Sequence, residues 1–266
     1  MDMNELKRRG LVLLGCGKMG SAMLEGWLKG ALDPADVWVI DPKPSEWLQQ
    51  TGVHINEGRP ENPAMLLVAV KPQMMTGALP DVAALGGGKT VVLSVAAGVT
   101  IAKFEDAFGA GTPIVRAMPN TPAAVGRGIT AIVANDDGQS SLDLAAELLD
   151  AVGQTVRLES EGQMDAVTAV SGSGPAYVFH MIECMAKAGE AQGLSPDLAL
   201  ALAKATVGGA GQLAEDSPKD PTTLRQEVTS PNGTTQAGLD VLMADLPDLM
   251  RRTITAAADR SRELGA

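Results

Sequence analysis

The feature that most constrains this chain is a glycine-rich turn between an apolar run and a helical stretch. Leu11–Leu14 is typical of a buried strand, and it is followed directly by a G-x-G-x-x-G pattern that opens the helical stretch Lys18–Lys29. Here the first glycine permits a tight turn, the second lets the backbone approach a pyrophosphate, and the third lets helix and strand pack closely. The helix start offers unpaired N–H groups to an anion. We predict a dinucleotide site, with a glycine-rich turn that binds nothing as the alternative; its residues are Gly15, Gly17, Lys18, Met19 and Gly20.

An acidic residue follows the second predicted strand at the spacing that ribose recognition requires. Asp41 lies 21 residues after Gly20, at the end of Val37–Ile40. A carboxylate there accepts a hydrogen bond from the adenosine ribose 2′-OH of NAD and disfavours the 2′-phosphate of NADP. Lys43, two residues further on, could attract that phosphate instead, and both residues could equally belong to an ordinary solvated loop. The residues therefore leave the choice between NADH and NADPH open.

Short apolar runs alternate with helical stretches through the first 160 residues. The runs are rich in Val, Leu and Ile and are bounded by Gly, Pro or Asp, as buried strands are. Helical stretches such as Lys18–Lys29 and Pro72–Leu85 separate them, which predicts an α/β fold with a Rossmann-type, doubly wound parallel sheet covered on both faces. The predicted strands are Leu11–Leu14, Val37–Ile40, Met65–Val70, Val91–Val95 and Ile114–Ala117; two further runs, Ile129–Ala134 and Thr155–Leu158, flank the helical stretch Ser140–Ala151 and could complete the sheet.

The pattern changes near residue 160, after which strand-like runs are almost absent. Ala- and Leu-rich stretches separated by Gly, Ser and Pro predict an all-helical domain over residues 161–266, after a dinucleotide-binding domain over residues 1–160. Many of these helices carry apolar residues on more than one face, which a small domain cannot bury alone, so we expect a homo-oligomer. The helical stretches are Ala176–Gln192, Pro196–Ala214, Pro221–Val228, Thr235–Met243 and Leu246–Leu264.

Charge and composition exclude several classes of protein. The chain has 21 Lys and Arg against 32 Asp and Glu, a net charge of −11, whereas binding to duplex nucleic acid needs a basic footprint. Two His and two Cys are too few for a His-rich or CxxC-type metal site, and two distant Cys favour a reducing compartment. No apolar run reaches the about 18 residues that span a bilayer, and the run after Lys7-Arg8-Arg9 is too short for a signal peptide. We expect a cytoplasmic protein without a metal and without nucleic-acid or membrane partners.

Three further segments end predicted strands, and in a doubly wound sheet ligands bind beyond the carboxyl ends of the strands. One strand ends in Lys71-Pro72, where the proline suits the first turn of a helix, and the next ends in small residues that would let a flat cofactor ring approach the backbone. A third ends in a proline-flanked turn with Asn120, which can donate and accept hydrogen bonds and is a predicted substrate ligand. A packing role is the alternative for these segments. The predicted cofactor contacts are Val70, Lys71, Pro72, Ala96, Ala97 and Gly98.

The helical half contains two polar segments, each at the start of a predicted helix. Ser171–Pro175 includes Ser173, and residues 228–235 form the longer segment. Free N–H groups and hydroxyls at a helix start suit a small carboxylate, although capping by a single Ser or Thr is common. The residues thus predict a nicotinamide-dinucleotide oxidoreductase whose helical domain closes over a small anionic substrate. The predicted substrate ligands of the helical half are Ser173, Ser230, Gly233 and Thr234.

These motifs resemble the Δ1-pyrroline-5-carboxylate reductase family along nearly the whole chain. Two positions depart from the family pattern. Asn232 stands where the family usually has glycine, and because Asn tolerates a left-handed backbone we expect the loop to be retained. Asp41 departs because the family commonly prefers NADPH. The discriminating stretches are Ala69–Pro72, Arg116–Pro122 with Gly126, Ser171–Tyr177, and above all Pro221-x-x-Leu224 leading into Val228–Leu239.

The resemblance implies reduction of a cyclic imine to L-proline by hydride transfer from NADPH or NADH, the last step of proline biosynthesis. The hydride would pass to the imine carbon, which becomes C5 of proline, and the ring nitrogen must gain a proton. Thr235 matches the family threonine that hydrogen-bonds this nitrogen, so it is the predicted catalytic residue, while Ser230, Gly233 and Thr234 would bind the carboxylate. The family also implies interlocked dimers, often assembled into decamers, with a pocket that could combine residues of two subunits.

Two other functions remain as alternatives. A β-hydroxyacid dehydrogenase has a similar dinucleotide domain followed by helices and uses a lysine, but neither Lys187 nor Lys204 has that family's surrounding Gly and Asn pattern. A protein that senses NAD(P) without turnover is the second alternative. The intact Thr235 and the two polar segments argue against a sensor.

Three side chains of chemical interest are expected to be structural. His180 could be proposed as a general acid, but it lies in an Ala- and Met-rich helix beyond the polar opening at Gly174. Tyr177 is nearer that opening, and a packing role is favoured for it. Cys184 is expected to pack as a small hydrophobic residue.

Overall fold

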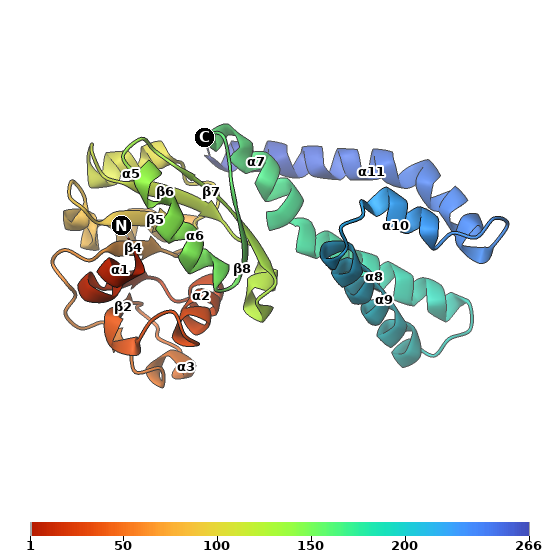
Figure 1. Ribbon diagram of the computed structural model, residues 1–266, viewed down its shortest axis with the longest axis horizontal. Coiled ribbons are helices and arrows are strands. Elements are labelled where there is room, and N and C mark those ends of the chain that lie inside the picture. The colour runs from red at the N-terminus through yellow and green to blue at the C-terminus, as the bar shows by residue number, and fades with distance from the viewer. Residues whose placement is uncertain (1, 266) are drawn as a thin grey trace. The chain divides into compact units, whose positions relative to one another are not determined.

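The computed structural model describes residues 2–265, and the chain divides into two compact units. The first, here called the sheet unit, comprises Met1–Gly172 with Ala257–Ala266, and the second, the helical unit, comprises Ser173–Ala256. Residues 161–172 and the end of the last helix therefore belong to the sheet unit, whereas the sequence pattern places the domain boundary at residue 160. The strand and helix labels used below are those of Figure 1.

The sheet unit is built on an eight-stranded sheet with the order β3-β2-β1-β4-β5-β6-β7-β8. Neighbouring strands run parallel, except that β6 and β7 are antiparallel. This arrangement confirms the predicted α/β fold with a doubly wound sheet, followed by a helical region. The strands are β1 (Leu11–Leu14), β2 (Val37–Ile40), β3 (His54–Ile55), β4 (Met65–Val68), β5 (Val91–Ser94), β6 (Ile114–Met118), β7 (Gly128–Ala134) and β8 (Gly153–Arg157).

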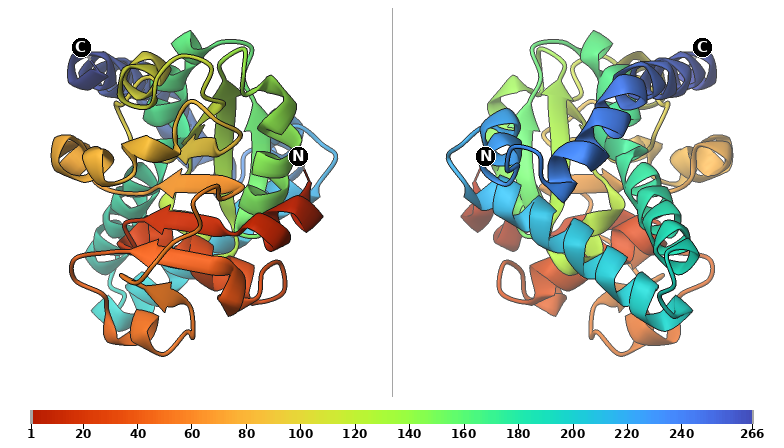
Figure 2. Two further views of the ribbon diagram at one scale, coloured as in Figure 1. Left: turned by 90° about the vertical axis from the view of Figure 1, so that its left-hand side faces the viewer. Right: turned by 90° about the vertical axis from the view of Figure 1, so that its right-hand side faces the viewer.

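Helices cover both faces of this sheet, as the two side views show (Figure 2). Successive residues of a central strand point to opposite faces of the sheet. In β1, two residues pack in one buried cluster and two in the other: Leu11 and Leu13, and Val12 and Leu14. Because both faces are covered, the central strands are apolar throughout, as buried parallel strands require. One face packs against α1 (Met3–Arg9), α2 (Lys18–Leu28), α3 (Glu46–Gln49) and α6 (Leu142–Asp150), and the other against α4 (Met75–Ala78), α5 (Ile101–Phe108) and α7 (Met164–Val167).

Two features of the sheet differ from the predicted pattern. β7 runs antiparallel to β6 because the connection between them holds only a short 3₁₀ turn, Thr121–Val125, and a parallel pair needs a crossover of a dozen or so residues. The strand β3 was not predicted, because its two residues are too few to give a periodic signal.

The predicted helix over Pro72–Leu85 is wrong. The segment forms the four-residue α4 with 3₁₀ turns on both sides. Pro80 lies in the middle of the segment, where a proline lacks the backbone N–H and clashes with the carbonyl four residues earlier. Gly77 weakens the helix further, since glycine has a low helix propensity.

The helical unit has little buried core of its own. Its small cluster consists of Ala186, Ala199 and Ala203 with Ile182 beside them, while large apolar side chains such as Phe179 remain exposed. This exposure agrees with the expectation of an oligomer. No helix among residues 2–265 is long and apolar enough to cross a bilayer. The helices are α8 (Gly174–Ala191), α9 (Pro196–Asp216), α10 (Pro221–Glu227) and α11 (Thr234–Gly265), and the last of these ends in the sheet unit.

Helix α11 joins two stretches that the sequence pattern separates, Thr235–Met243 and Leu246–Leu264. Pro247 lies inside it. An interior proline removes one backbone hydrogen bond, but the helix continues through it, so the proline does not mark a boundary here.

Three polar contacts join the segment after residue 160 to the rest of the sheet unit. Arg116 of β6 is nearly buried, and its guanidinium donates to Glu161 Oε1 at 2.6 Å. The same oxygen accepts the Ile101 N–H at the start of α5, at 2.9 Å. In addition, the Ser261 hydroxyl of α11 donates to Asp165 of α7 at 2.6 Å. Glu161 therefore connects a central strand, a helix start and the segment that leads into α8.

Replacing Glu161 with Ala should lower the free energy of unfolding by about 1.5–3 kcal/mol, because the nearly buried Arg116 loses its charge-assisted partner. Urea unfolding measures this loss. The matched control is Asp143→Ala, which removes the exposed ion pair with Arg157 (2.5 Å) and should change the stability by less than about 1 kcal/mol. Equal losses in the two variants would mean that the Arg116–Glu161 pair is worth no more than a surface pair.

Candidate functional site

The segments predicted to contact a cofactor lie together at one edge of the sheet. β2, β1, β4 and β5 are adjacent and parallel, so their carboxyl ends meet at that edge. Backbone hydrogen bonds continue just beyond the strands, from the Gly15 N–H to Ile40 O (2.8 Å) and from the Val95 N–H to Val68 O (3.1 Å). This is the edge at which open α/β sheets bind ligands. The segments that follow the strands are Gly15–Gly20, Asp41, Val70–Pro72 and Ala96–Gly98.

The three glycines of the turn differ in their surroundings. Gly15 has a φ of 88°, and a Cβ on it would lie 2.7 Å from Val70 Cγ1. A Cβ on Gly20 would lie 2.5 Å from the Gly15 carbonyl oxygen. Around Gly17, by contrast, no heavy atom lies within 4 Å of such a Cβ. Gly15 and Gly20 are therefore needed for the packing of the turn, whereas the space at Gly17 is open to an approaching pyrophosphate.

The start of α2 fits an anionic group. Gly17 is its N-cap residue, no side chain caps the helix, and its first turn holds no acidic residue. The unpaired N–H groups and the helix dipole therefore remain available to a phosphate. Lys18 at this start is exposed and Met19 is half-buried.

The Asp41 carboxylate connects the turns that follow β1 and β2. Its Oδ2 accepts the Cys16 N–H at 2.7 Å and its Oδ1 accepts the Lys43 N–H at 2.8 Å. Asn56, whose φ is 53°, exchanges two further hydrogen bonds with the backbone of Asp41. A carboxylate has lone pairs to spare after two such bonds and can still accept from a ribose hydroxyl. Sequence reasoning missed Asn56, because it is 15 residues away and follows a strand too short to detect.

The thiol of Cys16 lies inside the glycine-rich turn. Burial and, to a lesser degree, the charge of Asp41 raise the pKa of Cys16 to about 11. The thiol is therefore protonated at neutral pH, and only the thiolate is an effective nucleophile. Cys16 contributes its backbone N–H to this site and no reactive group.

The other two loops at the edge present both buried and exposed residues. Val70 is buried against Gly15, while Lys71 and Pro72 are exposed at the start of a 3₁₀ turn. The buried Ala96 donates its N–H to the Ser94 hydroxyl at 3.2 Å. In the same loop Ala97 is exposed, and Gly98 has a φ of 75°, which favours glycine.

Asn120 lies at the same edge, after β6, but its side-chain amide already has partners. The residue is 8% exposed, its Oδ1 accepts the Ile129 N–H at 3.0 Å, and its Nδ2 donates to the Ser171 carbonyl at 3.2 Å. The amide thus connects the turn between β6 and β7 to a π-helical turn, Thr168–Gly172. For the predicted contact between Asn120 and a substrate, the amide would have to bind the substrate in addition to these two partners.

Four of the predicted residues of the helical unit gather where the loop after α10 meets α11. The Gly233 N–H donates to the Ser230 carbonyl at 3.0 Å and closes a turn in which Asn232 has a φ of 58°. This confirms the prediction that Asn232 accommodates a left-handed backbone. Thr234 and Thr235 are the first two residues of α11 and are exposed, and the first turn of this helix holds no acidic residue.

The helix before this loop is fixed at both of its ends by side-chain oxygens. The Asp220 carboxylate caps α10 by accepting the N–H groups of Thr222 and Thr223, and it also accepts the Thr223 hydroxyl at 2.8 Å. The hydrogen bonds from Thr223, above all that from its hydroxyl, hold the pKa of Asp220 below its ordinary value. At the other end, the Thr229 hydroxyl donates to the Arg225 carbonyl at 2.6 Å. The loop therefore starts from a well-defined helix.

The polar segment Ser171–Pro175 lies at the start of a helix, as predicted, and most of it is itself helical. The π turn ends at Gly172, α8 begins at Gly174, and Ser173 forms a one-residue break between them. Ser171 is compatible with a helical turn because its hydroxyl donates to the Val167 carbonyl at 3.0 Å. No hydrogen bond within residues 2–265 joins Ser173 to the loop before α11.

His180 and Cys184 lie on an exposed part of α8. His180 Nδ1 is 3.1 Å from Glu183 Oε2, and the Cys184 sulfur is 3.6 Å from His180 Nε2. In the single chain Cys184 is exposed, so the prediction that it packs as a small hydrophobic residue is wrong for the isolated subunit. No group of three or more His, Cys, Asp or Glu in the described part of the chain could hold a metal ion.

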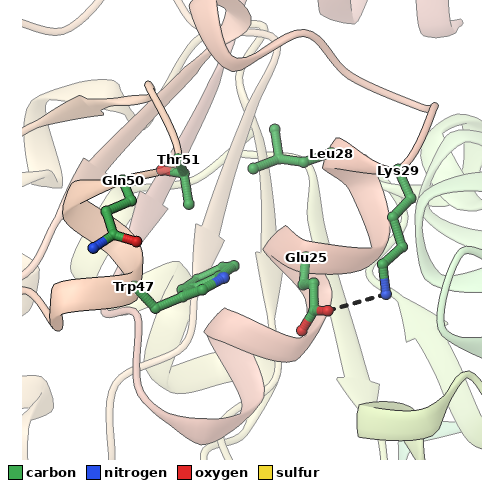
Figure 3. Close-up of a pocket in the computed structure, with 6 residues that line it drawn as sticks. All are labelled: Glu25, Leu28, Lys29, Trp47, Gln50 and Thr51. Carbon is green, nitrogen blue, oxygen red and sulfur yellow. Dashed lines mark ion pairs between the residues drawn. The ribbon is translucent and has the colours of Figure 1, made fainter.

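A surface hollow of about 330 Å³ lies at the opposite end of α2 from the glycine-rich turn (Figure 3). The Trp47 ring from α3 and the Leu28 side chain from α2 give it an apolar lining, and the Lys29–Glu25 ion pair (3.0 Å) borders it. Its remaining lining residues are Gln50 and Thr51. None of the predicted site residues lines this hollow.

Comparison with known proteins connects both units to one enzyme family. Residues 161–264 match the family model described as pyrroline-5-carboxylate reductase dimerisation, and residues 10–98 match the model described as NADP oxidoreductase, coenzyme F420-dependent. The chain is 36% identical to the pyrroline-5-carboxylate reductase of Pseudomonas aeruginosa over 96% of both chains. It is 38% identical to that of a Synechocystis species, over 96% of this chain and 98% of the relative.

The chain is also similar to solved structures of pyrroline-5-carboxylate reductases. A pyrroline-5-carboxylate reductase from Coxiella burnetii, 33% identical, superposes with a TM-score of 0.91 over 97% of this chain and 99% of its own. The pyrroline carboxylate reductase of Plasmodium falciparum, solved with NADP bound, is 26% identical and gives a TM-score of 0.83 over 98% of this chain and 100% of its own.

Replacing Gly17 with Val should abolish dinucleotide binding and leave the fold intact, because its side chain would occupy the open space at the start of α2. Gly20→Ala is the matched comparison: its Cβ would meet the Gly15 carbonyl, so it should lower the melting temperature. NAD(P)H fluorescence titration and thermal unfolding separate the two effects. Retained cofactor affinity in Gly17→Val would refute the assignment of this turn to the pyrophosphate.

Replacing Asp41 with Ser should raise kcat/KM for NADPH relative to NADH by about tenfold, since it removes a negative charge from the expected position of the 2′-phosphate. The control is Asp106→Ser, which makes the same charge change at an exposed position on α5. Steady-state rates with both cofactors give the ratio. The same ratio in Asp41→Ser and in the unmodified protein would show that Asp41 does not contact the ribose.

Proposed function

Because the chain belongs to the pyrroline-5-carboxylate reductase family, we propose that it reduces Δ1-pyrroline-5-carboxylate to L-proline with NADPH or NADH, the final step of proline biosynthesis. The observation that carries this proposal is the full-length similarity, 36–38% identity over 96% of the chain, to reductases with that name. The open space at Gly17, at a carboxyl edge of parallel strands, supports dinucleotide use independently.

The sheet unit supplies the cofactor-binding residues in this proposal. The uncapped start of α2, with Gly15, Gly17, Lys18, Met19 and Gly20, holds the pyrophosphate. Asp41 faces the adenosine ribose, and the loops after β4 and β5 approach the rest of the dinucleotide through their backbone. When bound, the reduced nicotinamide would supply the hydride for the imine carbon of the substrate, which becomes C5 of proline. The loop residues are Val70, Lys71, Pro72, Ala96, Ala97 and Gly98.

The helical unit supplies the substrate-binding residues. Ser230 and Thr234 offer hydroxyls, and Thr234 also a backbone N–H, at the start of α11, where the helix dipole favours a carboxylate and no acidic residue opposes it. Gly233, the third proposed ligand, donates its own N–H to the Ser230 carbonyl and closes the turn that presents these groups. Ser173, at the start of α8, is the further proposed ligand. Asn120, the other residue predicted to bind substrate, donates to the Ser171 carbonyl and accepts the Ile129 N–H through its side-chain amide.

Thr235 is the proposed catalytic residue. A neutral C=N bond accepts hydride poorly, so the ring nitrogen must be hydrogen-bonded or protonated as the hydride arrives. The exposed Thr235 hydroxyl, one residue into α11, donates to this nitrogen and stabilises the developing product amine. A transition-state hydrogen bond of this kind raises kcat rather than only lowering KM.

Assembly and location follow the family. The exposed apolar side chains of α8, α9 and α11 suit a homodimer formed through the helical units, and a decamer assembled from such dimers is the larger assembly proposed. The reducing conditions that suit two free cysteines support a cytoplasmic location.

The test of the proposed function is turnover. Purified protein should consume NADPH or NADH in the presence of pyrroline-5-carboxylate and form proline, and initial rates with each cofactor give the preference. Cofactor binding without turnover would favour an NAD(P) sensor instead. Turnover of a β-hydroxyacid in place of the imine would favour a dehydrogenase of that class.

Replacing Thr235 with Ala should lower kcat by about ten- to two-hundred-fold, the equivalent of a charge-assisted hydrogen bond worth about 1.5–3 kcal/mol. Thr235→Ser keeps the hydroxyl and should retain much of the activity. Cofactor affinity should stay unchanged in both variants, because the sheet unit holds the dinucleotide. Unchanged kcat in Thr235→Ala would reduce this residue to a helix-start residue, and the proton would then come from solvent.

A further inference from the structure

We propose that Asn120 is a positioning residue, which fixes the π turn Thr168–Gly172 and thereby the point where α8 begins, and that it does not contact the substrate itself. The proposal rests on the proposed reductase function, since its consequence is measured on substrate turnover. It assigns the β6 end of the sheet unit a role in substrate use, in addition to the cofactor loops.

The first observation is that the side-chain amide of Asn120 is nearly buried and is used at both of its ends. Its oxygen accepts the Ile129 N–H at 3.0 Å, and its nitrogen donates to the Ser171 carbonyl at 3.2 Å. With 8% of the residue exposed, little of it remains accessible to a ligand. The hydrogen bonds of this amide are therefore made to the backbone of the same chain.

The second observation is that alternate residues at the end of β6 and in the turn after it contact the segment 161–172. Arg116 binds Glu161 at 2.6 Å, and Asn120 binds Ser171. Between them, Met118 packs so closely on Gly172 that a Cβ there would lie 2.6 Å from the Met118 methyl group. Side chains two residues apart on a strand share one face, so the end of β6 and its turn hold both ends of segment 161–172.

The third observation is the π turn itself. A π-helical turn is rarely stable alone, and within helices it occurs mostly as single turns that are frequent at functional sites. Hydroxyls support this turn from inside, through Thr168 to the Met164 carbonyl (2.8 Å) and Ser171 to the Val167 carbonyl (3.0 Å). Asn120 adds a hydrogen bond to the Ser171 carbonyl from the turn after β6. Ser173, a proposed substrate ligand, follows one residue after the turn, so a shift of the turn displaces it.

The chain offers a matched control for this proposal at the other end of the same strand pair. Asn135 Oδ1 accepts the Ile114 and Gly138 N–H groups, at 3.0 and 2.9 Å. Its Nδ2 donates to the Thr112 carbonyl at 3.0 Å and to Glu105 Oε1 at 2.9 Å, so Asn135→Asp also places a second carboxylate beside Glu105. It is also an asparagine that connects backbone segments, but it has no contact with the π turn. The substitution Asn→Asp removes the amide donor and keeps an acceptor at both positions.

The experiment compares Asn120→Asp with Asn135→Asp in the full-length protein. Backbone hydrogen exchange is measured without substrate on peptides covering residues 164–178, together with kcat/KM for pyrroline-5-carboxylate and the Kd of NAD(P)H. Asn120→Asp should speed exchange in these peptides and lower kcat/KM about tenfold, the worth of about one hydrogen bond, with the Kd of NAD(P)H unchanged. Asn135→Asp should leave all three unchanged, even where it lowers the melting temperature. Asn120→Ser, which retains a smaller polar group, should give the Asn120→Asp pattern if the latter is too unstable to measure.

Three results would overturn the proposal. Lost turnover with unchanged exchange would mean that Asn120 contacts the substrate directly. Equal losses of turnover in the Asn120 and Asn135 variants would mean a general effect of stability, and wild-type exchange and turnover in Asn120→Asp would mean that the contact has no role. Failure of the proposed function is seen separately, as an unmodified protein that does not turn over the imine.

Discussion

Parallel pairing of β2, β1, β4 and β5 is the constraint on which the rest of the sheet unit depends. Parallel strands need crossover connections, so every strand in this group ends at the same edge and every following turn begins there. Helices must then cover both faces of the sheet. Successive residues of a central strand point to opposite faces, which explains why all of them are apolar. Residues that are up to about eighty positions apart in the sequence, such as Gly17 and Ala97, thereby reach one edge without any specific contact between them.

At that edge the candidate dinucleotide site is formed mainly by backbone groups and less by side chains. Gly15 and Gly20 are required by close contacts within the turn, while Gly17 is left open. The Asp41 carboxylate holds the Cys16 N–H and fixes the turn against β2. A site made from fixed N–H groups and a helix start loses little flexibility when an anion binds, which is the physical advantage of this arrangement.

The sequence predicted the parts of this structure that depend on local chemistry. Strand runs, the glycine-rich turn and the left-handed Asn232 follow from short patterns whose causes lie within a few residues. It did not predict the antiparallel β7, the broken helix around Pro80 or the π turn before α8, because in each case a connection length or a long-range contact decides the outcome. The partners of Asn120 and Arg116 lie 9 to 51 residues away, and no local pattern indicates them. The segments of the candidate cofactor site could thus be predicted, whereas long-range contacts such as those of Asn120 and Arg116 could not.

Hydride transfer from the nicotinamide to the imine carbon is the reaction proposed for this chain. The most direct measurement uses NADPH or NADH deuterated on the transferred face of nicotinamide C4, with unlabelled pyrroline-5-carboxylate, and analyses the proline formed by mass spectrometry and NMR. Proline that carries a single deuterium, at C5, is the expected product. Proline without deuterium, or oxidation of the cofactor without formation of proline, would contradict it.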